Sequence, residues 1–345
     1  MDACTYRNRI RNYIAGRFEN RHGCMLFINF PFITSVTGVN LQEYFNDPKT
    51  MMDAQVETWD ALGVKGWLWP DLGVVPECAA MGAKVVYDDR GFPSISAPAD
   101  KEISDFLDLK PADPYGGNML TQALNALEYM VVHKPDGFEV QSSIVQSAFT
   151  GAAMLRGIND FCADVIEEPE AVCALMDLVL ETDIRYMKAQ EKILGKLDHI
   201  LLSDDVSALV SANSFREMIL PYYERFFEPF PESQRWLHND AQALHLAPVL
   251  KEINFKLWHT GSCFDSRRAM ELLDHSLCLA GNLSPVALAR MTEEEAYDAA
   301  VKELKQFNAE PRYLLGTGGF ISYGTPVENV RAILAAAENI KFNEA

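Results

Sequence analysis

The sequence predicts an α/β protein with a (β/α)8 TIM barrel, and three observations lead to this prediction. Short apolar runs alternate with longer amphipathic runs along the 345 residues, as strands alternate with helices. Over roughly the last 150 residues this alternation is regular, which indicates parallel βα units. The apolar runs number about eight, which favours a closed barrel over an open doubly wound sheet.

The candidate strands are the short apolar runs. They are residues 24–29, 66–69, 84–88, 137–142, 199–203, 235–238, 255–259, 277–281 and 313–316. The longest candidate helix, 169–194, begins with Pro169, which suits the first helical turn. Other candidate helices are residues 213–227, 265–275, 284–307 and 325–340. Ser284 and Thr325 each precede a proline, and this pairing of a capping residue with proline is typical of a helix start.

We expect a single barrel domain over residues 1–345. Within it, residues 1–23 are predicted to form an N-terminal helical segment. The region around residues 70–118 is richer in Pro, Gly and Asp than its surroundings. Such composition is typical of loops, so we interpret this region as a loop-rich excursion from the barrel.

Charge and cysteine content narrow the class of protein. The net charge of −19 at pH 7 argues against binding to nucleic acid or to an anionic membrane. The seven cysteines are odd in number and scattered, and no CxxC occurs, which is typical of a reduced cytoplasmic protein. We find neither the apolar segment of a signal peptide nor an apolar run of about 18 residues, so we expect no membrane span.

In a TIM barrel, functional side chains gather at the carboxyl ends of the strands. Polar residues and glycines follow several of the predicted strands. They are Asp204, Asp205, His238, Asp240, His259, Cys263, Asn282, Gly318 and Gly319. Imidazole, carboxylate and thiolate groups suit zinc, which takes four N, O or S donors and leaves one position open in catalytic sites.

These residues divide into three predicted roles. The predicted metal ligands are His238, Asp240, His259 and Cys263. The predicted proton-transfer residues are Asp204, Asp205 and Asp240, because adjacent carboxylates at a barrel opening can have a raised pKa. The predicted cofactor contacts are Asn282, Gly318 and Gly319, since glycines after a strand can form a small anion-binding nest.

Each of these residues also has a simpler interpretation. A histidine at a strand end is often a hydrogen-bonded polar residue without a ligand, and Cys263 can be a small residue at a helix start. The Asp204–Asp205 pair can form an Asx turn or a helix cap. In "RWLHNDAQALH", residues 235–245, either Asn239 or Asp240 can cap the helix predicted to follow.

Five segments of the chain resemble the uroporphyrinogen decarboxylase superfamily. "AGNLSP" resembles its GN-x-x-P signature, and "GTPVENVRAIL" is similar to its last barrel helix. The other three resembling segments are residues 45–63, 148–161 and 215–226. The five occur in the superfamily's order and extend through nearly the whole chain. The resemblance implies a distorted (β/α)8 barrel.

One departure points away from uroporphyrinogen itself as the substrate. True uroporphyrinogen decarboxylases carry an arginine-containing motif just after the first strand. Here that place reads "FINFPFITS", residues 27–35, without an arginine. A polycarboxylate substrate needs cationic partners, so this substrate does not suit the chain.

The corrinoid-dependent methyltransferases of the superfamily resemble this chain in length and layout. They bind zinc through an H-x-C motif at the end of the sixth strand and a cysteine near the last strand, and some add a glutamate after the seventh. His238 matches the family histidine, and Asp240 stands where the first cysteine would be. His259 lies close to the glutamate position. The last cysteine would fall near Gly318 and is absent.

The resemblance, with this departure, implies a particular chemistry. Oxygen and nitrogen donors in place of thiolates make a more Lewis-acidic metal, which suits a methyl ether or methylamine better than a thiol. We therefore expect a zinc-dependent methyltransferase that moves a methyl group from a small methylated compound to a corrinoid protein. His238 would be the main ligand, Asp240 and His259 co-ligands, and Asp204 or Asp205 a further ligand or proton donor.

Five aromatic residues near predicted strand ends are candidates for an apolar wall around a donor ring and a corrin face. They are Phe30, Phe32, Trp67, Trp69 and Trp258.

Two other functions stay open. One is a metal-independent decarboxylase or related lyase, in which the Asp204–Asp205 pair would supply the proton chemistry. The other is a non-catalytic relative that binds a corrinoid or tetrapyrrole. Superfamily barrels occur as monomers and as dimers, so a monomer or homodimer is expected.

Overall fold

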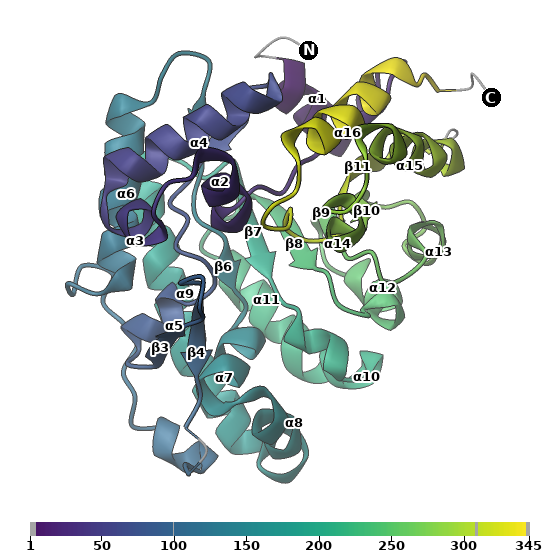
Figure 1. The fold of residues 1–345 in the computed structure, drawn as a ribbon. Helices are drawn as coiled ribbons and strands as arrows, with labels where there is room; N and C mark the ends of the chain where they lie inside the picture. Colours follow the sequence, from purple (N-terminus) through teal and green to yellow (C-terminus); the bar gives the residue numbers. More distant parts are fainter. Residues whose placement is uncertain (1–4, 99, 308–309, 343–345) are drawn as a thin grey trace.

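The computed structural model describes residues 5–98, 100–307 and 310–342. At its centre, parallel strands curve into a barrel with helices around the outside (Figure 1). The main ladder has seven strands in the order β1-β11-β10-β9-β8-β7-β6. Their bounds are β1 Gly23–Cys24, β6 Val145–Gln146, β7 His199–Ser203, β8 Gln234–Asn239, β9 Phe255–Thr260, β10 Cys278–Leu283 and β11 Tyr313–Thr317.

A second, short ladder completes the barrel. β2 (Trp67–Leu68) pairs in parallel with β5 (Glu139–Val140), and Gln141 N then donates to Leu68 O. Since β5 and β6 lie on the same stretch, residues 139–146 act as one interrupted strand that joins the two ladders. When this stretch is counted once, the described residues form eight barrel strands, which confirms the predicted (β/α)8 class. These strands are β1, β2, β5/β6, β7, β8, β9, β10 and β11.

One predicted strand, residues 84–88, lies outside the barrel, in the region predicted as a loop-rich excursion. β3 (Lys84–Tyr87) pairs antiparallel with β4 (Pro93–Ser96) in a hairpin. The physical reason is the turn between them, where Asp88 Oδ1 accepts hydrogen bonds from Arg90 N and Phe92 N and returns the chain at once. Without this hairpin, β8 is the fifth barrel strand, so His238 ends the fifth strand and not the sixth.

The hairpin belongs to the region around residues 70–118. This region also contains α5 (Pro76–Ala80) and a 3₁₀ turn, Ile103–Phe106. In Figure 1 the hairpin and α5 lie to one side of the barrel strands.

The long predicted helix is confirmed as α9, Pro169–Leu194. The predicted helix 284–307 is instead two helices, α14 (Pro285–Leu288) and α15 (Glu293–Gln306). The break arises because Thr292 and Glu295 form a capping box that starts a new helix.

The predicted helix 213–227 is also irregular. It consists of α10 (Ala212–Ser214), a π-helical turn over Phe215–Ile219, and α11 (Leu220–Phe227). Pro221 has no N–H to donate, which favours such a change of helical register.

Of the two residues predicted to cap a helix before a proline, the structure confirms one and not the other. Ser284 is confirmed, because its side chain accepts from Ala287 N at the start of α14. Thr325 was wrong as a cap. Its hydroxyl donates to Ser322 O within a turn, and α16 (Val327–Asn339) begins only after Pro326.

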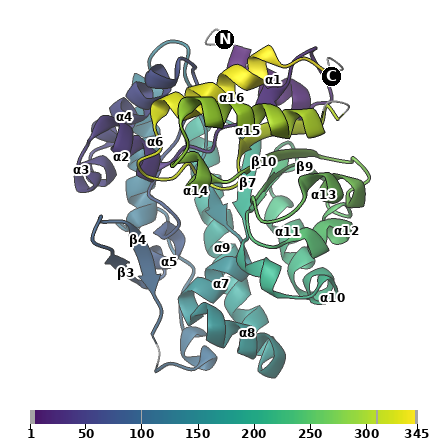
Figure 2. The ribbon, with the colours of Figure 1, turned by 45° about the vertical axis from the view of Figure 1, so that its right-hand side comes forward.

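The remaining helices surround the barrel. They are α1 Thr5–Ile14, α2 Phe30–Thr37, α3 Leu41–Asn46, α4 Pro48–Leu62, α6 Met119–His133, α7 Ala148–Arg156, α8 Ile158–Glu167, α12 Ala247–Leu250 and α13 Ser266–Leu272. α15 and α16 pack side by side across one end of the molecule (Figure 2). None of the helices described is long and apolar enough to cross a membrane.

Candidate metal centre

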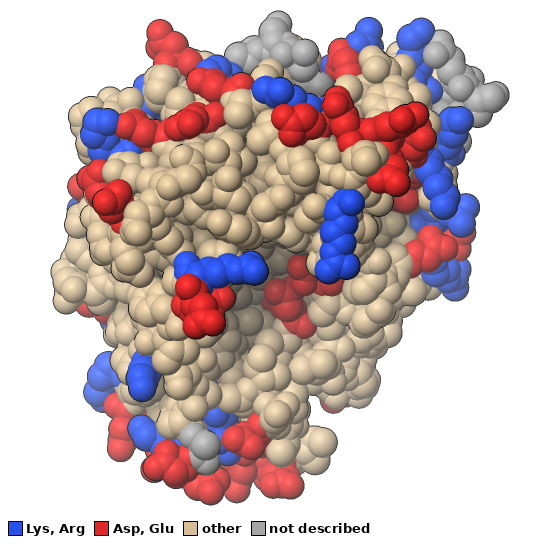
Figure 3. Space-filling view, viewed as in Figure 1, with Lys and Arg blue, Asp and Glu red and all other residues tan. Residues whose placement is uncertain are grey.

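The carboxyl ends of β7, β8 and β9 lie side by side. In the parallel register Ser203 is opposite His238, and His238 is opposite His259. The residues just after β7 therefore lie beside the end of β8, as strand-end reasoning predicts. On the face of the molecule seen in Figure 3, a hollow with largely uncharged walls is bordered by acidic and basic side chains.

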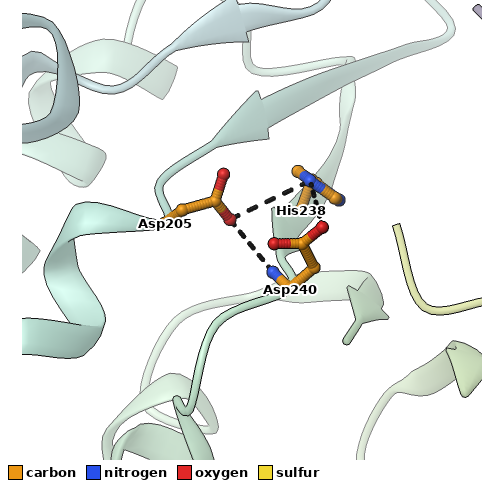
Figure 4. Close-up of side chains that lie close together, drawn as sticks. All are labelled: Asp205, His238 and Asp240. Atoms are coloured by element: carbon orange, nitrogen blue, oxygen red, sulfur yellow. Dashed lines mark hydrogen bonds and ion pairs between the residues drawn. The ribbon is translucent and has the colours of Figure 1, made fainter. Parts of the chain in front are cut away.

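Three predicted site residues converge at these strand ends, where the barrel opens: Asp205, His238 and Asp240 (Figure 4). His238 Nε2 lies 3.9 Å from Asp205 Oδ1 and 3.9 Å from Asp240 Oδ2. One ligand atom from each of the three residues lies within 4.8 Å of the other two. The imidazole is buried, whereas the carboxylates are partly open to solvent.

The carboxylate of Asp205 also fixes the backbone of its neighbour. Its Oδ1 accepts a hydrogen bond of 3.0 Å from Asp240 N. Burial raises the pKa of Asp205, and the nearby His238 partly opposes this change. The cluster thus combines one carboxylate oxygen from each of Asp205 and Asp240 with one imidazole nitrogen of His238. The strand ends and the hydrogen bond from Asp240 N to Asp205 hold these side chains in place.

The glycines after β11 allow close packing at this site. Gly319 has φ of +102°, and a Cβ there would lie 2.5 Å from Asp240 Oδ2, so a side chain would strain the backbone and collide with the carboxylate. A Cβ on Gly318 would lie 2.2 Å from Ser262 N. Gly319 therefore borders the cluster, and Gly318 packs against the segment after β9.

Asp204 is not part of the cluster, although it precedes Asp205 in the chain. Its Oδ1 accepts from Thr150 Oγ1 at 2.6 Å, and its Oδ2 accepts from the Tyr223 hydroxyl. It is fully buried, and burial raises its pKa. The two adjacent carboxylates thus diverge, which removes the paired-acid geometry that a metal-independent decarboxylase would need.

His259 lies behind His238 rather than beside the carboxylates. Its Nδ1 is 2.8 Å from His238 Nδ1, and its Nε2 is 3.0 Å from Thr317 O. Burial, and secondly the charge of His238, lower the pKa of His259 well below its usual value. With both ring nitrogens engaged, the structure places His259 outside the group of metal-ligand atoms.

Two further predicted residues lie outside the cluster. Cys263 is exposed, and its thiol donates to Asp240 O over 3.4 Å. Burial of its sulfur raises the pKa of Cys263. Asn282 has φ of +101°, and its amide donates to Glu303 Oε1.

The interpretation of Asn239 or Asp240 as a helix cap was wrong. Asn239 Oδ1 accepts from Ala241 N, and its amide nitrogen donates to Asp204 O and to Ser207 Oγ. The helical turns begin only at Leu244. Because Asn239 joins the ends of β7 and β8, its neighbours His238 and Asp240 are free to face the opening.

A cavity of about 160 Å³ adjoins the cluster. Its apolar wall includes Phe30 and Trp69, as the sequence predicts, together with Phe320. The other predicted aromatics, Phe32, Trp67 and Trp258, are buried and do not line it. The full lining is Asn29, Phe30, Trp69, Asp71, Gly73, Val74, Pro93, Ile144, Gln146, Ser203, Asp205, His238 and Phe320.

Sequence reasoning missed four polar residues of this cavity: Asn29, Asp71, Gln146 and Ser203. Asn29 Oδ1 is buried without a partner among the described residues. Burial raises the pKa of Asp71 to about 7. Asn29 ends one predicted strand, and Asp71 comes two residues after another. The strand-end rule, applied to the first half of the chain, would therefore have found both.

The donor set fits a zinc ion. Two ligands about 2 Å from zinc lie roughly 3.3 Å apart at a tetrahedral angle, so the observed 3.9 Å needs only small side-chain adjustments. One imidazole and two carboxylates with an open fourth position are typical of catalytic rather than structural zinc. His238 also bonds through its other ring nitrogen, as zinc-binding histidines usually do.

Comparison with known proteins supports the fold and identifies the family. The chain is 24% identical over 299 residues to a methylated-thiol–coenzyme M methyltransferase of Methanosarcina mazei, covering 85% of this chain and 77% of that protein. The solved structure of a methyltransferase from Methanosarcina mazei superposes with a TM-score of 0.81, at 19% identity over 96% of this chain and 97% of that one.

A more distant fold likeness is to a B12-independent methionine synthase from Shewanella in complex with selenomethionine. Its TM-score is 0.52, at 13% identity over 86% of this chain and 88% of the other. The uroporphyrinogen decarboxylase family model matches residues 32–340, nearly the whole chain. The protein belongs to the uroporphyrinogen decarboxylase family.

Proposed function

We propose that this protein is a metal-dependent methyltransferase that moves a methyl group from a small methylated donor to a corrinoid protein. The observation that carries the proposal is the convergence of Asp205, His238 and Asp240 on one point beside a cavity. The similarity to a methyltransferase over 85% of the chain supports the reaction class. The corrinoid acceptor comes from the resemblance of the sequence to the corrinoid-dependent branch.

Asp205, His238 and Asp240 would hold the metal, for which zinc is the candidate. When bound, the metal supplies a Lewis acid that draws electrons from the heteroatom carrying the methyl group. During transfer, the bond from the methyl carbon to that heteroatom would break, with its electron pair staying on the heteroatom. A new bond would form between the methyl carbon and the reduced cobalt of the corrinoid acceptor, which supplies the electron pair. The proton that the leaving heteroatom then takes up would come from water, because Asp205 and Asp240 act as charged ligands in this proposal.

The cavity sets the size of the donor. A volume of about 160 Å³ is close to that of an engineered cavity of roughly 150 Å³ that binds benzene in another protein. A ring or a small amine of similar size would therefore fill it. Phe30, Trp69 and Phe320 would contact its apolar part.

The cavity also sets the charge of the donor. Among the described residues that line it, none is Lys or Arg, and two, Asp71 and Asp205, are acidic. Apart from the proposed metal, a donor with a carboxylate or sulfonate in this cavity would have no cationic side chain to pair with and would meet Asp71 and Asp205. We therefore propose a neutral or cationic donor of the methyl ether or methylamine type.

The test combines metal analysis with a transfer assay. Purified protein is expected to contain about one equivalent of metal and to methylate reduced cobalamin from one or more members of a panel of methyl ethers and methylamines. His238→Ala should lose both the metal and the transfer, whereas the matched control His245→Ala, at an exposed histidine, should keep both.

The proposed role of a metal in methyl transfer would be contradicted by two results together. The purified protein would contain no metal, and methyl transfer would persist both after chelation and in His238→Ala. Binding of a corrinoid protein without turnover on any donor would instead favour a non-catalytic relative. Release of CO2 from a carboxylic acid in the presence of chelator would favour a decarboxylase.

A further inference from the structure

The histidine pair behind the cluster has a fixed hydrogen-bond polarity. Thr317 O is a carbonyl oxygen and can only accept, so His259 Nε2, 3.0 Å away, carries the hydrogen. The contact of 2.8 Å between His259 Nδ1 and His238 Nδ1 needs one donor and one acceptor. At least one of the two rings must therefore be neutral.

Burial decides which ring accepts. His259 is 0% exposed, and no carboxylate of the described residues lies within ion-pair distance of it. Charging this ring would therefore bury an uncompensated cation. Since Nε2 already holds the hydrogen, Nδ1 of a neutral His259 is an acceptor. His238 Nδ1 is then the donor, so the neutral form of His238 has its lone pair on Nε2, on the side of Asp205 and Asp240.

Packing keeps both rings in this orientation. The ring of Phe27 lies 5.0 Å from that of His238 and 4.4 Å from that of His259, measured between centroids. Phe320 stacks on Phe27 at 4.2 Å with an interplanar angle of 6°. The strand register also places the two histidines directly opposite each other. Neither imidazole can rotate freely without breaking this contact.

We propose that His259 is a positioning residue that fixes the tautomer of His238, so that Nε2 is the nitrogen presented to the two carboxylates. Two hydrogen bonds in series make this connection: His259 Nε2 donates to Thr317 O, and His238 Nδ1 donates to His259 Nδ1. Outer partners of this kind orient metal-binding histidines and change metal affinity about 10–100-fold when removed. The tautomer stands without any metal, whereas its effect on affinity rests on the proposed function.

The test uses variants of His259 that separate the loss of its hydrogen bonds from the loss of its ring. His259→Leu removes the acceptor and leaves His238 Nδ1–H without a partner. His259→Gln offers an oxygen to accept from His238 and an amide to donate to Thr317 O, so it keeps the polarity. His199→Leu is the matched control, because His199 is another barrel imidazole, stacked on Trp236 at the amino end of β7 and away from the opening.

The direct readout is ¹⁵N NMR of metal-free protein labelled at histidine nitrogens, with the His238 signals assigned through His238→Gln. At a pH where His238 is neutral, the wild type is expected to have the hydrogen on His238 Nδ1 and the lone pair on Nε2. His259→Leu should shift His238 toward the other tautomer, whereas His259→Gln and His199→Leu should not. Calorimetric Zn²⁺ affinity should fall about 10–100-fold in His259→Leu and stay close to wild type in the other two.

Each other outcome is decisive. A wild-type His238 with its hydrogen on Nε2, or a tautomer unchanged in His259→Leu, overturns the proposal. Equal loss of Zn²⁺ affinity in His259→Gln and His259→Leu would make His259 itself a ligand and also overturn it. If the wild type binds no metal, the proposed function fails. The NMR result alone then decides whether His259 fixes the tautomer of His238.

Discussion

The two halves of the barrel are built differently. The strands β7 to β11 have five or six residues each and form a continuous parallel ladder. In the first half, β1, β2, β5 and β6 have two residues each, and the chain around them is irregular. His238 lies on a long strand, and Asp205 and Asp240 follow the ends of long strands, whereas the irregular segments supply most of the cavity wall.

The metal site and the donor pocket require different precision in the placement of their atoms. A metal site requires atoms placed within a fraction of an ångström, which strands in a ladder provide. A donor pocket tolerates more variation, and loops on a rigid scaffold usually shape it. Metal binding and donor choice should therefore respond to different substitutions, and four predictions test this separation.

The largest expected effect is a loss of stability in the ladder half. A Cβ on Gly316 would lie 2.3 Å from Met25 O, a backbone atom that cannot move without opening the contact between β1 and β11. Gly316→Ala should lower the free energy of unfolding by about 3 kcal/mol or more. Gly82→Ala, at φ of +99° with open space around it, should cost only about 1–2 kcal/mol of backbone strain.

Urea denaturation of the two glycine variants measures this difference. Equal losses of stability would mean that the ladder half is no more tightly constrained than the excursion.

The second prediction concerns a buried acid of the irregular half. Burial raises the pKa of Glu77 from 4.5 to about 7, while its Oε1 accepts from Gln146 N. Because the folded pKa is the higher one, this carboxyl stabilises the fold fully below pH 4.5, and the contribution is lost as pH rises to about 7. Glu77→Gln keeps an acceptor but does not titrate.

The stability of Glu77→Gln relative to wild type should therefore increase between pH 4 and pH 8, by about 3 kcal/mol. Denaturation curves at several pH values check this. Glu232→Gln, at an exposed acid, should follow the wild type at every pH. A difference that does not change with pH would show that folding does not raise the pKa of Glu77.

The third prediction separates the adjacent acids. Asp205→Asn and Asp240→Asn should each weaken Zn²⁺ binding by about 100-fold or more, because each removes a charged ligand. Asp204→Asn should leave the affinity near wild type. It should instead lower stability by about 1–3 kcal/mol, since Thr150 and Tyr223 lose a charged acceptor.

Calorimetric titration with Zn²⁺ and thermal denaturation give both quantities for all three variants. Loss of zinc binding in Asp204→Asn without loss of stability would contradict the assignment of Asp204 to the interior.

The smallest expected effect is on donor binding. Val74 lines the cavity and is 40% exposed, so a larger side chain there should narrow the entrance with little cost to the fold. Val74→Trp should raise KM for the donor by about tenfold, with kcat and metal content unchanged. A fall in metal content would show that the cavity and the metal centre are not separable.

Sequence reasoning reached much of the fold and part of the site. The apolar runs of β7 and β9 and the amphipathic period of α9 are strong signals, and their predicted bounds differ from the structure by at most one residue. The run at 84–88 has the same apolar character as a barrel strand. Only the turn after Asp88, which returns the chain antiparallel, distinguishes it.

At the site, the strand-end rule found Asp205, His238 and Asp240 but not the direction of each side chain. Asp204 and Asp205 are adjacent and chemically identical, so their different partners depend on where Thr150 and Tyr223 lie, 54 and 19 residues away in the chain. Asn29 and Asp71 were missed because the strand-end rule was applied to polar residues only in the second half of the chain, although both lie at or just after the ends of predicted strands.

By itself, the sequence determined the fold class, the family and the strand ends at which acidic and imidazole groups occur, because these depend on local periodicity and on short motifs. Only the tertiary structure decided that Asp205 faces the opening while Asp204 faces the interior, and that His259 supports His238 from behind. Such choices depend on hydrogen-bond partners distant in the chain, which only the closed barrel brings within reach.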